Sequence, residues 1–199
     1  MIQDTGVKEQ LIDATLLSEG EREELIRLGI LSEEGMIQPS PIHPPERSLI
    51  QKRAVHAPNV LNDAFDYFPT PSSFSRGLAF ELNGYKILLI SGTASVDENG
   101  ESIHIGDLRA QCWRTYSNIT SLLESEGMTW QDIVRTTCYL RDIERDYKDF
   151  NEIRTAFFNW QHLDPLPAST GIQARLCREN LLVEIDAVAI CPSNSTKRR

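Results

Sequence analysis

Two apolar runs separated by a two-residue polar step predict a β-hairpin in the middle of the chain. The runs are GLAFEL over residues 77–82 and YKILLISG over residues 85–92, and Asn83-Gly84 stands between them. Asn-Gly is the pair that a two-residue hairpin turn prefers, because both positions need a positive φ. We therefore expect two antiparallel strands joined by a tight turn.

Apolar residues at helical spacing follow this hairpin. They stand at successive steps of four, four, three and four residues: Leu108, Cys112, Tyr116, Ile119 and Leu123. This spacing places them on one stripe of a helix. Asp107 is a suitable N-cap and Gly127 a suitable C-terminal stop, so we expect one helix between them.

The next segments alternate strand and helix patterns. Residues 132–142 have a period of two, which is typical of a strand with unlike faces. One of these faces carries Val134, Thr136, Cys138 and Leu140. A second helix from about Tyr147 would bury Phe150, Ile153 and Phe157. Two further strands are predicted at residues 171–176 and 181–190, joined by residues 177–180.

The resulting order, strand-strand-helix-strand-helix-strand-strand, predicts an α+β fold with a mixed sheet and both helices on one face. On the last strand, one face is small and apolar and suits helix packing: Val183, Ile185, Ala187 and Ala189. The other face mixes apolar residues with two carboxylates: Leu182, Glu184, Asp186, Val188 and Ile190. Because a monomer would leave this face in water, we expect an oligomer, and a cyclic trimer would place pockets between subunits.

Residues 1–60 differ in composition from the rest and are predicted to form an N-terminal extension. Residues 8–28 suit one or two amphipathic helices broken near residues 18–20. Residues 38–47 hold four prolines and are predicted to form an extended linker. We therefore divide the chain into an extension at 1–60, an α+β domain at 61–191 and a C-terminal tail at 192–199.

The charge balance narrows the classes of partner. Twenty Lys and Arg against 29 Asp and Glu leave a net charge of −9 on 199 residues, which opposes binding to a nucleic-acid backbone. The chain has no 18-residue apolar run and no signal-peptide pattern, so we expect a cytoplasmic protein outside the membrane. Its four cysteines and four histidines lack metal-ligand spacing, so we expect no metal and no cofactor.

Candidate chemistry begins with the two carboxylates of the last strand. Glu184 and Asp186 project from the same face of a strand, two residues apart. Desolvation there would raise the pKa of a carboxyl group, which suits a residue that holds or deprotonates water. The same spacing also fits a cross-strand ion pair with Arg175 or another arginine.

Two further segments offer groups that could bind a ligand. Within residues 165–171, Ser169, Thr170 and Gly171 can present hydroxyl and backbone N–H groups to a carboxylate, and the segment equally fits a loop without a ligand. Ser91-Gly92 ends a buried strand where glycine permits close approach of a backbone or a substrate. A β-bulge is the alternative interpretation of that glycine.

Three segments, taken in order, resemble the Rid superfamily of YjgF-type reactive-intermediate (enamine/imine) deaminases. They are ILLISGTASVDENGES at 87–102, DIVRTTCYLRDIERDYKDFNEIRTAFF at 132–158 and LPASTGIQARLCRENLLVEIDAVAI at 166–190. The resemblance covers about residues 74–191. It implies a chorismate mutase-like fold and a homotrimer with clefts between its subunits.

The resemblance also implies roles for single residues. Glu184 matches the family glutamate that positions the hydrolytic water, and Ser91-Gly92 match a cleft-lining Ser-Gly pair. Asn151 matches the family asparagine before the second helix. Phe74 stands about where the deaminases carry a tyrosine, so the ring is kept and the hydroxyl is lost.

One position departs from the family pattern. Ala168 stands where the deaminases carry an arginine that binds the substrate carboxylate bidentately. Arg76 and Arg175 are the candidate cations that could substitute for it. The Phe-Ser-Arg, Ser-Gly-Thr and Ser-Thr-Gly-Ile stretches are similar to the chorismatase-like branch, which hydrolyses an enol ether of chorismate.

The expected function is hydrolysis or deamination of a small carboxylate-bearing metabolite in an intersubunit cleft. Glu184 would act there as the general acid and base that positions water. Two alternatives stay open: a chorismatase-like enol-ether hydrolase, and a non-catalytic metabolite-binding or regulatory protein.

Overall fold

A computed structural model describes residues 17–38, 50–64 and 72–193. The chain divides into two units, residues 1–49 and 50–199, and the first contains the helix α1 (Glu19–Arg27). Ser18 caps α1 in a capping box with Glu21, because each side chain accepts a hydrogen bond from the other's backbone N–H. The predicted break near residues 18–20 is thus where this helix starts. Residues 8–16 of the predicted helices and residues 39–47 of the predicted linker lie outside the described residues.

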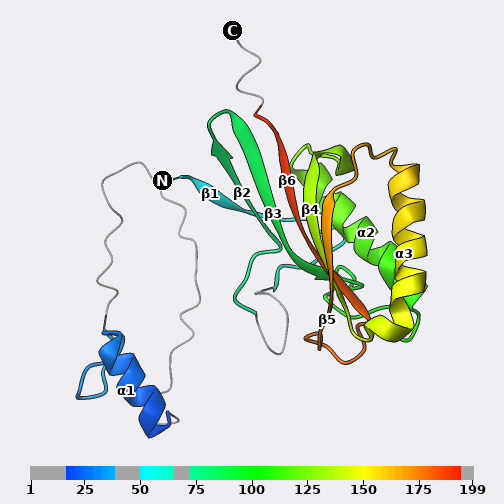
Figure 1. The fold of residues 1–199 in the computed structure, drawn as a ribbon. Coiled ribbons are helices and arrows are strands. Elements are labelled where there is room, and N and C mark those ends of the chain that lie inside the picture. The colour runs from blue at the N-terminus through cyan, green and yellow to red at the C-terminus, as the bar shows by residue number, and fades with distance from the viewer. Residues whose placement is uncertain (1–16, 39–49, 65–71, 194–199) are drawn as a thin grey trace. The chain divides into compact units, whose positions relative to one another are not determined.

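The second unit is built on one six-stranded mixed sheet with the strand order β1-β2-β3-β6-β4-β5 (Figure 1). Its strands are β1 (Lys52–Val55), β2 (Gly77–Leu82), β3 (Tyr85–Ala94), β4 (Ile133–Leu140), β5 (Ala168–Gln173) and β6 (Val183–Pro192). Neighbouring strands are antiparallel except β4 and β5, which are parallel. The predicted α+β fold with a mixed sheet is confirmed, and β1 is an additional strand.

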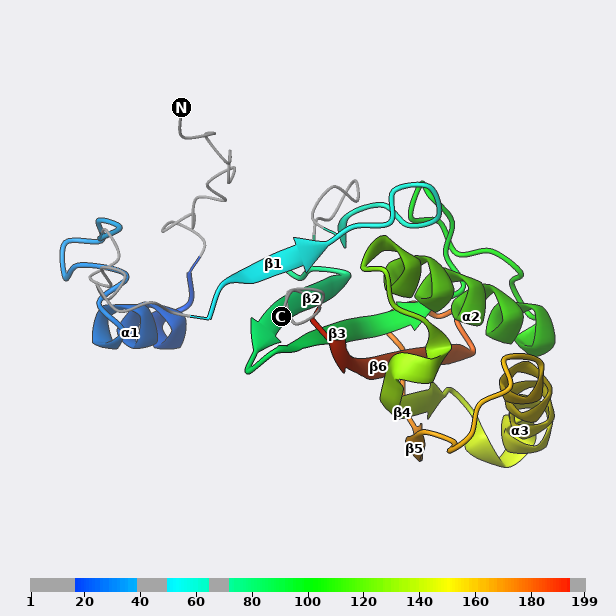
Figure 2. The same ribbon diagram turned by 90° about the horizontal axis from the view of Figure 1, so that it is seen from above.

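Two long helices, α2 (Leu108–Ser125) and α3 (Ile143–Trp160), lie against the same face of the sheet (Figure 2). As predicted, the Asp107 side chain caps α2 and Gly127 follows its end with a φ of +65°. The second helix starts before the predicted Tyr147, because Asp142 caps it. Within the described ranges, no helix has the length and apolarity needed to cross a membrane.

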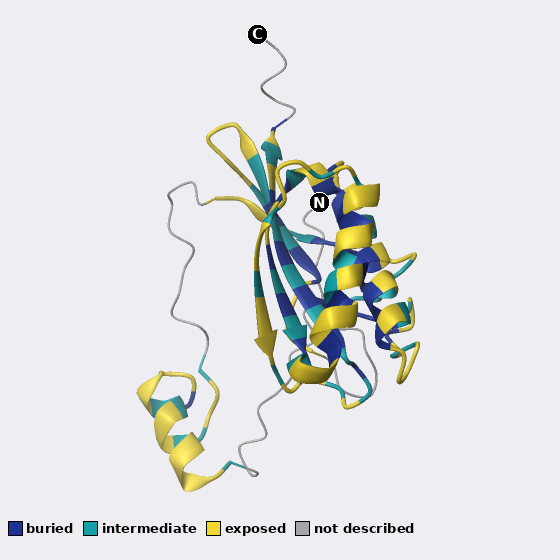
Figure 3. Cartoon of the chain, turned by 45° about the vertical axis from the view of Figure 1, so that its right-hand side comes forward, coloured by how far each residue is buried: buried dark blue, intermediate teal, exposed yellow. Residues whose placement is uncertain are grey.

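The core lies between this face of the sheet and the two helices (Figure 3). Tyr116 and Phe157 stack with their ring centroids 4.4 Å apart. Trp130, from the short 3₁₀ helix η2 (Trp130–Asp132), meets Tyr116 edge-on at 5.6 Å. The inner face predicted for the last strand is buried in this core: Val183, Ile185, Ala187 and Ala189. Packing of the inner face therefore fixes the alternate residues of β6 on the opposite, helix-free face.

The hairpin between β2 and β3 has the predicted turn. Leu82 pairs with Tyr85, which leaves Asn83 and Gly84 as a two-residue loop. Their φ angles are +49° and +82°, and positive values at both positions are the mark of a type I′ turn.

Two details of the sheet differ from the sequence prediction. A β-bulge between Ile133 and Arg135 turns Val134 outward, so its side chain is 44% exposed instead of sharing the buried face of Thr136. The strand predicted at residues 171–176 is β5, which starts at Ala168 and ends before Arg175. Because β5 forms the edge of the sheet beside β4, it is no neighbour of β6.

The strand β1 is tied to the end of α2 by an ion pair. The Glu126 side chain, only 3% exposed, accepts hydrogen bonds from both terminal nitrogens of Arg53. Lys86 of β3 lies 3.7 Å from the same carboxylate and donates to the backbone carbonyl of Glu126 at 2.7 Å. These contacts join β1, β3 and α2, so in the structure the second unit begins before residue 61.

Candidate active site around Glu184

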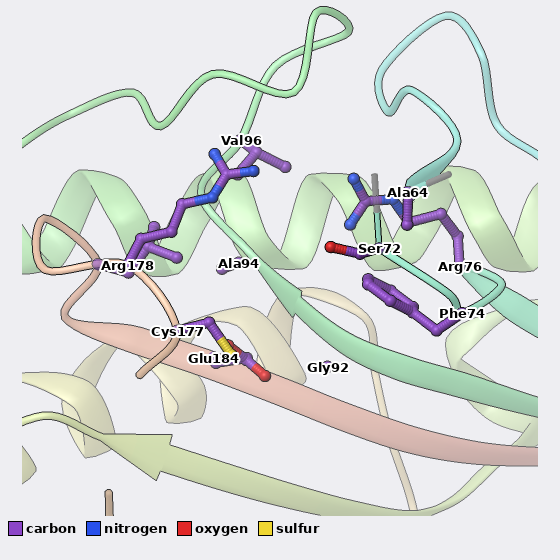
Figure 4. Close-up of a pocket in the computed structure, with 11 residues that line it drawn as sticks. Ala64, Ser72, Phe74, Arg76, Gly92, Ala94, Val96, Cys177, Arg178 and Glu184 are labelled. Atoms are coloured by element: carbon purple, nitrogen blue, oxygen red, sulfur yellow. The ribbon is translucent and has the colours of Figure 1, made fainter. Parts of the chain in front are cut away.

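A cavity of about 140 Å³ opens beside the paired ends of β3 and β6 (Figure 4). The charged residues among its described walls are Arg76, Arg178 and Glu184. Its apolar walls are formed by Ala64, Phe74, Ala94, Val96 and Leu181. Since one water molecule occupies about 30 Å³ of liquid, this volume suits a small metabolite.

Glu184 lies across the backbone of Gly92. The strands pair with Ala94 opposite Glu184, and a bulge interrupts the register between Ile90 and Thr93. A Cβ atom on residue 92 would come 2.0 Å from Oε1 of Glu184. Glycine is therefore the residue that leaves this carboxylate where it is, and the close approach expected at Gly92 is an approach of Glu184.

Burial and charge together make Glu184 a weaker acid than usual. Desolvation is the main cause that raises its pKa, repulsion from Asp186 adds to it, and attraction to Arg76 opposes it. Asp186 is itself held by Tyr139, whose hydroxyl donates to Oδ2 at 2.8 Å. A carboxyl group that keeps its proton above the usual pH range can donate that proton to a substrate and take it back.

Arg76, which immediately precedes β2, supplies a fixed cation in the same cavity. Its side chain is 9% exposed, and Asn62 accepts from Nε through its carbonyl at 2.8 Å and from Nη2 through Oδ1 at 2.9 Å. The guanidinium lies 5.5 Å from the centre of the Phe74 ring. Burial and then repulsion from Arg178 lower the pKa of Arg76, while Asp63 and Glu184 oppose this shift; an arginine nevertheless stays charged.

Among the wall residues that sequence reasoning missed are Cys177 and Arg178. Both lie in the connection between β5 and β6, which the sequence predicts only as a turn. Arg178 donates from Nη1 to the carbonyl of Gly100 and to Oγ of Ser102, the latter at 3.3 Å. The sequence does show a cation, Arg178, six residues before Glu184. It does not show on which side of the sheet the turn that carries this cation lies.

Ser91 is not among the described residues that line the Glu184 cavity, and its side chain contacts the backbone instead. Its hydroxyl donates to the carbonyl of Ser75 at 2.7 Å, and its backbone N–H donates to the carbonyl of Arg76 at 3.1 Å. Phe74, by contrast, lines the cavity with its ring (Figure 4). Ser91 thus helps to place the segment that carries both Phe74 and Arg76.

Asn151 and Ser169 belong to a separate cluster between α3 and β5. Arg154 of α3 donates to Oδ1 of Asn151 at 2.6 Å and to Oγ of Ser169 at 3.2 Å. Thr136 of β4 also donates to Ser169, at 3.0 Å. Within one chain these residues are not part of the Glu184 cavity.

Thr170 and Gly171 lie farther along β5, also outside this cavity. Arg135 of β4 stands directly opposite Ala168 and donates from Nη2 to Oγ1 of Thr170 at 3.1 Å. A guanidinium therefore lies one strand away from Ala168, a position that sequence reasoning did not identify.

The structure corrects the expected position of Arg175. This residue follows the end of β5, and its side chain is 86% exposed and 3.9 Å from Glu179. Because β4 lies between β5 and β6, Arg175 is not on a strand beside Glu184. Arg76 is the candidate cation that the structure places in the cavity of Glu184.

The site provides a carboxyl group with a raised pKa, a fixed guanidinium and an apolar wall. In the part of the chain that the structure describes, no group of three or more His, Cys, Asp or Glu side chains is arranged to hold a metal ion. The described side chains are thus suited to acid–base chemistry on a small anion.

Comparison with known proteins defines the class. The sequence model described as Endoribonuclease L-PSP matches residues 72–191, the part that contains Arg76, Gly92 and Glu184. The chain belongs to this family, which is the YjgF/Rid family.

Individual relatives show how far the similarity extends. The 3-aminoacrylate deaminase RutC of Acinetobacter baylyi is 30% identical over 103 residues, which cover 52% of this chain and 78% of the relative. A RutC family protein of Pyrococcus abyssi is 28% identical over 102 residues, covering 51% and 76%.

Solved structures share the fold. The YjgF gene product of E. coli matches with a TM-score of 0.55 at 24% identity, over 69% of this chain and 98% of its own. E. coli TdcF, solved with bound serine, matches with a TM-score of 0.57 at 18% identity, over 70% and 98%. At these identities the structural matches establish the fold alone.

We expect Gly92→Ala to displace the Glu184 carboxylate without unfolding the protein. The new methyl group would overlap the end of a flexible side chain, with Oε1 only 2.0 Å away. A crystal structure of the variant should show Glu184 in a different rotamer. Gly171→Ala is the control, because the nearest atom to a Cβ there is 3.8 Å away. The free energy of unfolding of both variants should lie within about 1 kcal/mol of the wild-type value. A Glu184 side chain that keeps its wild-type position in Gly92→Ala would contradict the prediction.

Glu184 should also make stability depend on pH. Its folded-state pKa lies above the ordinary value of 4.5, so the folded chain keeps a proton that the unfolded chain releases as the pH rises. The free energy of unfolding contributed by this group therefore falls from pH 4.5 upward and is constant below that range. In urea denaturation, Glu184→Gln should be more stable than wild type at pH 7, and the difference should shrink towards pH 4. A wild type that gains stability over the variant with rising pH would refute this.

Proposed function

We propose that this protein is a Rid-type hydrolase or deaminase for a small carboxylate-bearing metabolite, with Glu184 as general acid and base. One observation carries the proposal: a single cavity holds the Glu184 carboxyl group, whose pKa is raised by burial, and the buried guanidinium of Arg76. Hydrolysis of an enamine carboxylate needs both groups, because a cation orients the substrate while an acid protonates its carbon.

The steps can be written for 2-aminoacrylate. Arg76 binds the carboxylate, and protonated Glu184 gives its proton to the terminal carbon as the C=C bond becomes a C–C bond and the nitrogen lone pair forms an iminium. The Glu184 carboxylate then takes a proton from water as the water oxygen bonds to C2. Transfer of that proton to nitrogen lets ammonia leave, and the remaining hydroxyl proton returns to Glu184 as pyruvate forms.

The same cycle applies to 3-aminoacrylate, the compound named for the Acinetobacter baylyi relative. Here protonation falls on C2 and water adds to C3, so the products are 3-oxopropanoate and ammonia. An enol ether also needs a proton delivered to carbon before water adds, which makes enol ethers the second substrate class to test.

The charge of the chain argues against the nuclease activity in the family description. A net charge of −9 opposes the phosphate contacts on which RNA binding depends. On the helix-free face of β6, Glu184 and Asp186 are two further acidic side chains that would repel RNA phosphates. All four cysteines are free thiols, which supports the cytoplasm as the compartment of the protein.

Activity is tested by measuring ammonia and oxo-acid release from freshly generated 2- and 3-aminoacrylate. We expect Glu184→Gln to lose at least about 100-fold in turnover, because it cannot donate the proton. Arg76→Gln should mainly raise KM, since its expected task is to bind the carboxylate. Arg109→Gln, which removes one exposed cation from α2, should leave turnover unchanged.

Two outcomes would contradict the proposal. Full activity in Glu184→Gln would exclude the role assigned to that residue. Wild-type protein that releases no product from either enamine, or from an enol ether, while still binding carboxylates, would favour the non-catalytic metabolite-binding alternative.

We further propose that the protein assembles as a homotrimer through the helix-free face of the sheet. Leu89 and Ile190 are 40% and 38% exposed there, although both lie on central strands. Their cross-strand partners on this face, Val188 and Ile87, are apolar as well. Such an apolar patch on the middle of a sheet is typical of a subunit interface. A neighbouring subunit would also be needed to bring Asn151 and Ser169 near a Glu184 cavity.

Light scattering coupled to size exclusion tests this assembly. The wild type should have about three times the 22.6 kDa mass of one chain. Leu89→Asp should dissociate it by placing a charge in the interface, whereas Trp160→Asp, at a 71% exposed site on the helical layer, should not. A wild-type mass of one chain would refute the trimer.

A further inference from the structure

One residue, Asn62, holds the Arg76 guanidinium by a single edge. Its backbone carbonyl accepts from Nε at 2.8 Å, and its Oδ1 accepts from Nη2 at 2.9 Å. A guanidinium can bind a bidentate partner by its Nε and Nη2 edge or by its Nη1 and Nη2 edge. Within the described residues, Nη1 has no hydrogen-bond partner. The edge that includes Nη1 therefore remains for a ligand.

This edge belongs to a buried side chain of the Glu184 cavity. Arg76 is 9% exposed, and it lines the same cavity as Glu184 (Figure 4). Both acceptors that Asn62 offers are neutral oxygens, so they satisfy N–H groups of the guanidinium without cancelling its charge. A carboxylate suits the second edge, because its two oxygens match the two N–H donors of a guanidinium fork.

Asn62 is itself fixed from both sides of the chain. The preceding residue, Leu61, is 1% exposed and belongs to the hydrophobic core. Arg114 of α2 donates from Nη2 to the carbonyl of Val60 at 3.3 Å and from Nε to the carbonyl of Val96 at 3.1 Å. The segment that carries Asn62 and the cavity wall at Val96 are thus tied to the same helix. Such preorganisation reduces the entropy cost of binding.

The segment around Asn62 lies before the region that the family model matches, which begins at residue 72. Ala64 of this segment is nevertheless 3% exposed and lines the cavity. At its other end, Val55 of β1 pairs with Gly77, the residue after Arg76. Residues 50–64 therefore contribute directly to the arrangement of the candidate site.

We propose that Asn62 is a positioning residue, which holds the Nε and Nη2 edge of Arg76 and so directs the Nη1 and Nη2 edge to the substrate carboxylate. This inference rests on the proposed function and specifies how the substrate is bound. The carboxylate lies in the plane of the guanidinium and accepts one N–H from each terminal nitrogen. Asn62 is not among the described residues of the cavity wall, so it acts through Arg76.

Binding can be measured without turnover by an NMR titration with pyruvate, a product of the proposed cycle. Asn62→Ala removes Oδ1 and keeps the backbone carbonyl. We expect it to weaken pyruvate binding at least about fivefold, because the guanidinium loses one of its two holds. In turnover assays KM should rise while kcat stays within about twofold. Asn159→Ala, the same change at an exposed position of α3, should alter neither value.

A double-mutant cycle shows whether Asn62 acts through Arg76. In an Arg76→Gln background, Asn62→Ala should cause no further loss of pyruvate affinity, because the guanidinium that it positions is gone. An equal loss in both backgrounds would overturn the inference and indicate a structural role for Asn62 elsewhere.

The NMR signals of the Arg76 side chain give a readout that needs no ligand. We expect two separate Nη signals in the wild type, assigned by their absence in Arg76→Gln, because the hold on both Nε and Nη2 slows rotation about the Cζ–Nε bond. Asn62→Ala should merge them into one averaged signal. Asn62→Asp keeps an acceptor oxygen at the same position and should keep both signals.

A single averaged signal in the wild type would refute the inference, even where the Asn62 variants do not fold. Pyruvate binding and turnover that are unchanged in Asn62→Ala would also refute it and leave the proposed function standing. Two signals in a wild type that neither binds pyruvate nor turns over an enamine or enol ether would do the reverse: they would support the hold of Asn62 on Arg76 and refute the proposed function.

Discussion

The alternation of side chains along β6 is the constraint on which the site depends. Because β6 lies in the middle of the sheet, its inner residues are buried under the helices, and a shift by one residue would turn all of them towards the helix-free face. The same period of two fixes Glu184 and Asp186 on that face. The hydrophobic core therefore holds the candidate acid in place, and the missing side chain at Gly92 leaves room for its carboxyl group.

Electrostatic effects of opposite sign meet at this carboxyl group. Burial and Asp186 favour its protonated form, and Arg76 favours its charged form. Tyr139 donates a hydrogen bond to Asp186 and so restrains the second carboxylate. A carboxyl group whose pKa is raised is better suited to donate a proton and to take it back, which the proposed cycle of carbon protonation and hydration requires.

Features governed by local pattern could be predicted from the sequence, and those governed by long-range chain placement could not. The Asn83-Gly84 turn, the Asp107 cap and the two faces of β6 follow from neighbouring residues alone, and the structure has all three. The four-residue β1 has a single buried side chain, Val55, so its sequence carries little strand signal. Arg178 enters the cavity because the turn before β6 folds over the end of β3, and Arg175 leaves it because β5 joins the far side of β4. Both depend on topology that residue spacing does not contain.

Because Ala168 offers no cation, the proposed binding of a carboxylate depends on another residue of the cavity. With Ala168 on β5, the guanidinium that lies in the Glu184 cavity and acts on the Glu184 carboxyl group is that of Arg76, in the segment before β2. In the proposed function, a substrate anchored by Arg76 is oriented by the same subunit that protonates it. Orientation and proton transfer would then depend on one rigid frame, formed by the pairing of β3 with β6 and by the hydrogen bonds that Arg76 donates to Asn62. In the proposed trimer, the neighbouring subunit would close the cavity and exclude water without having to supply the first cation.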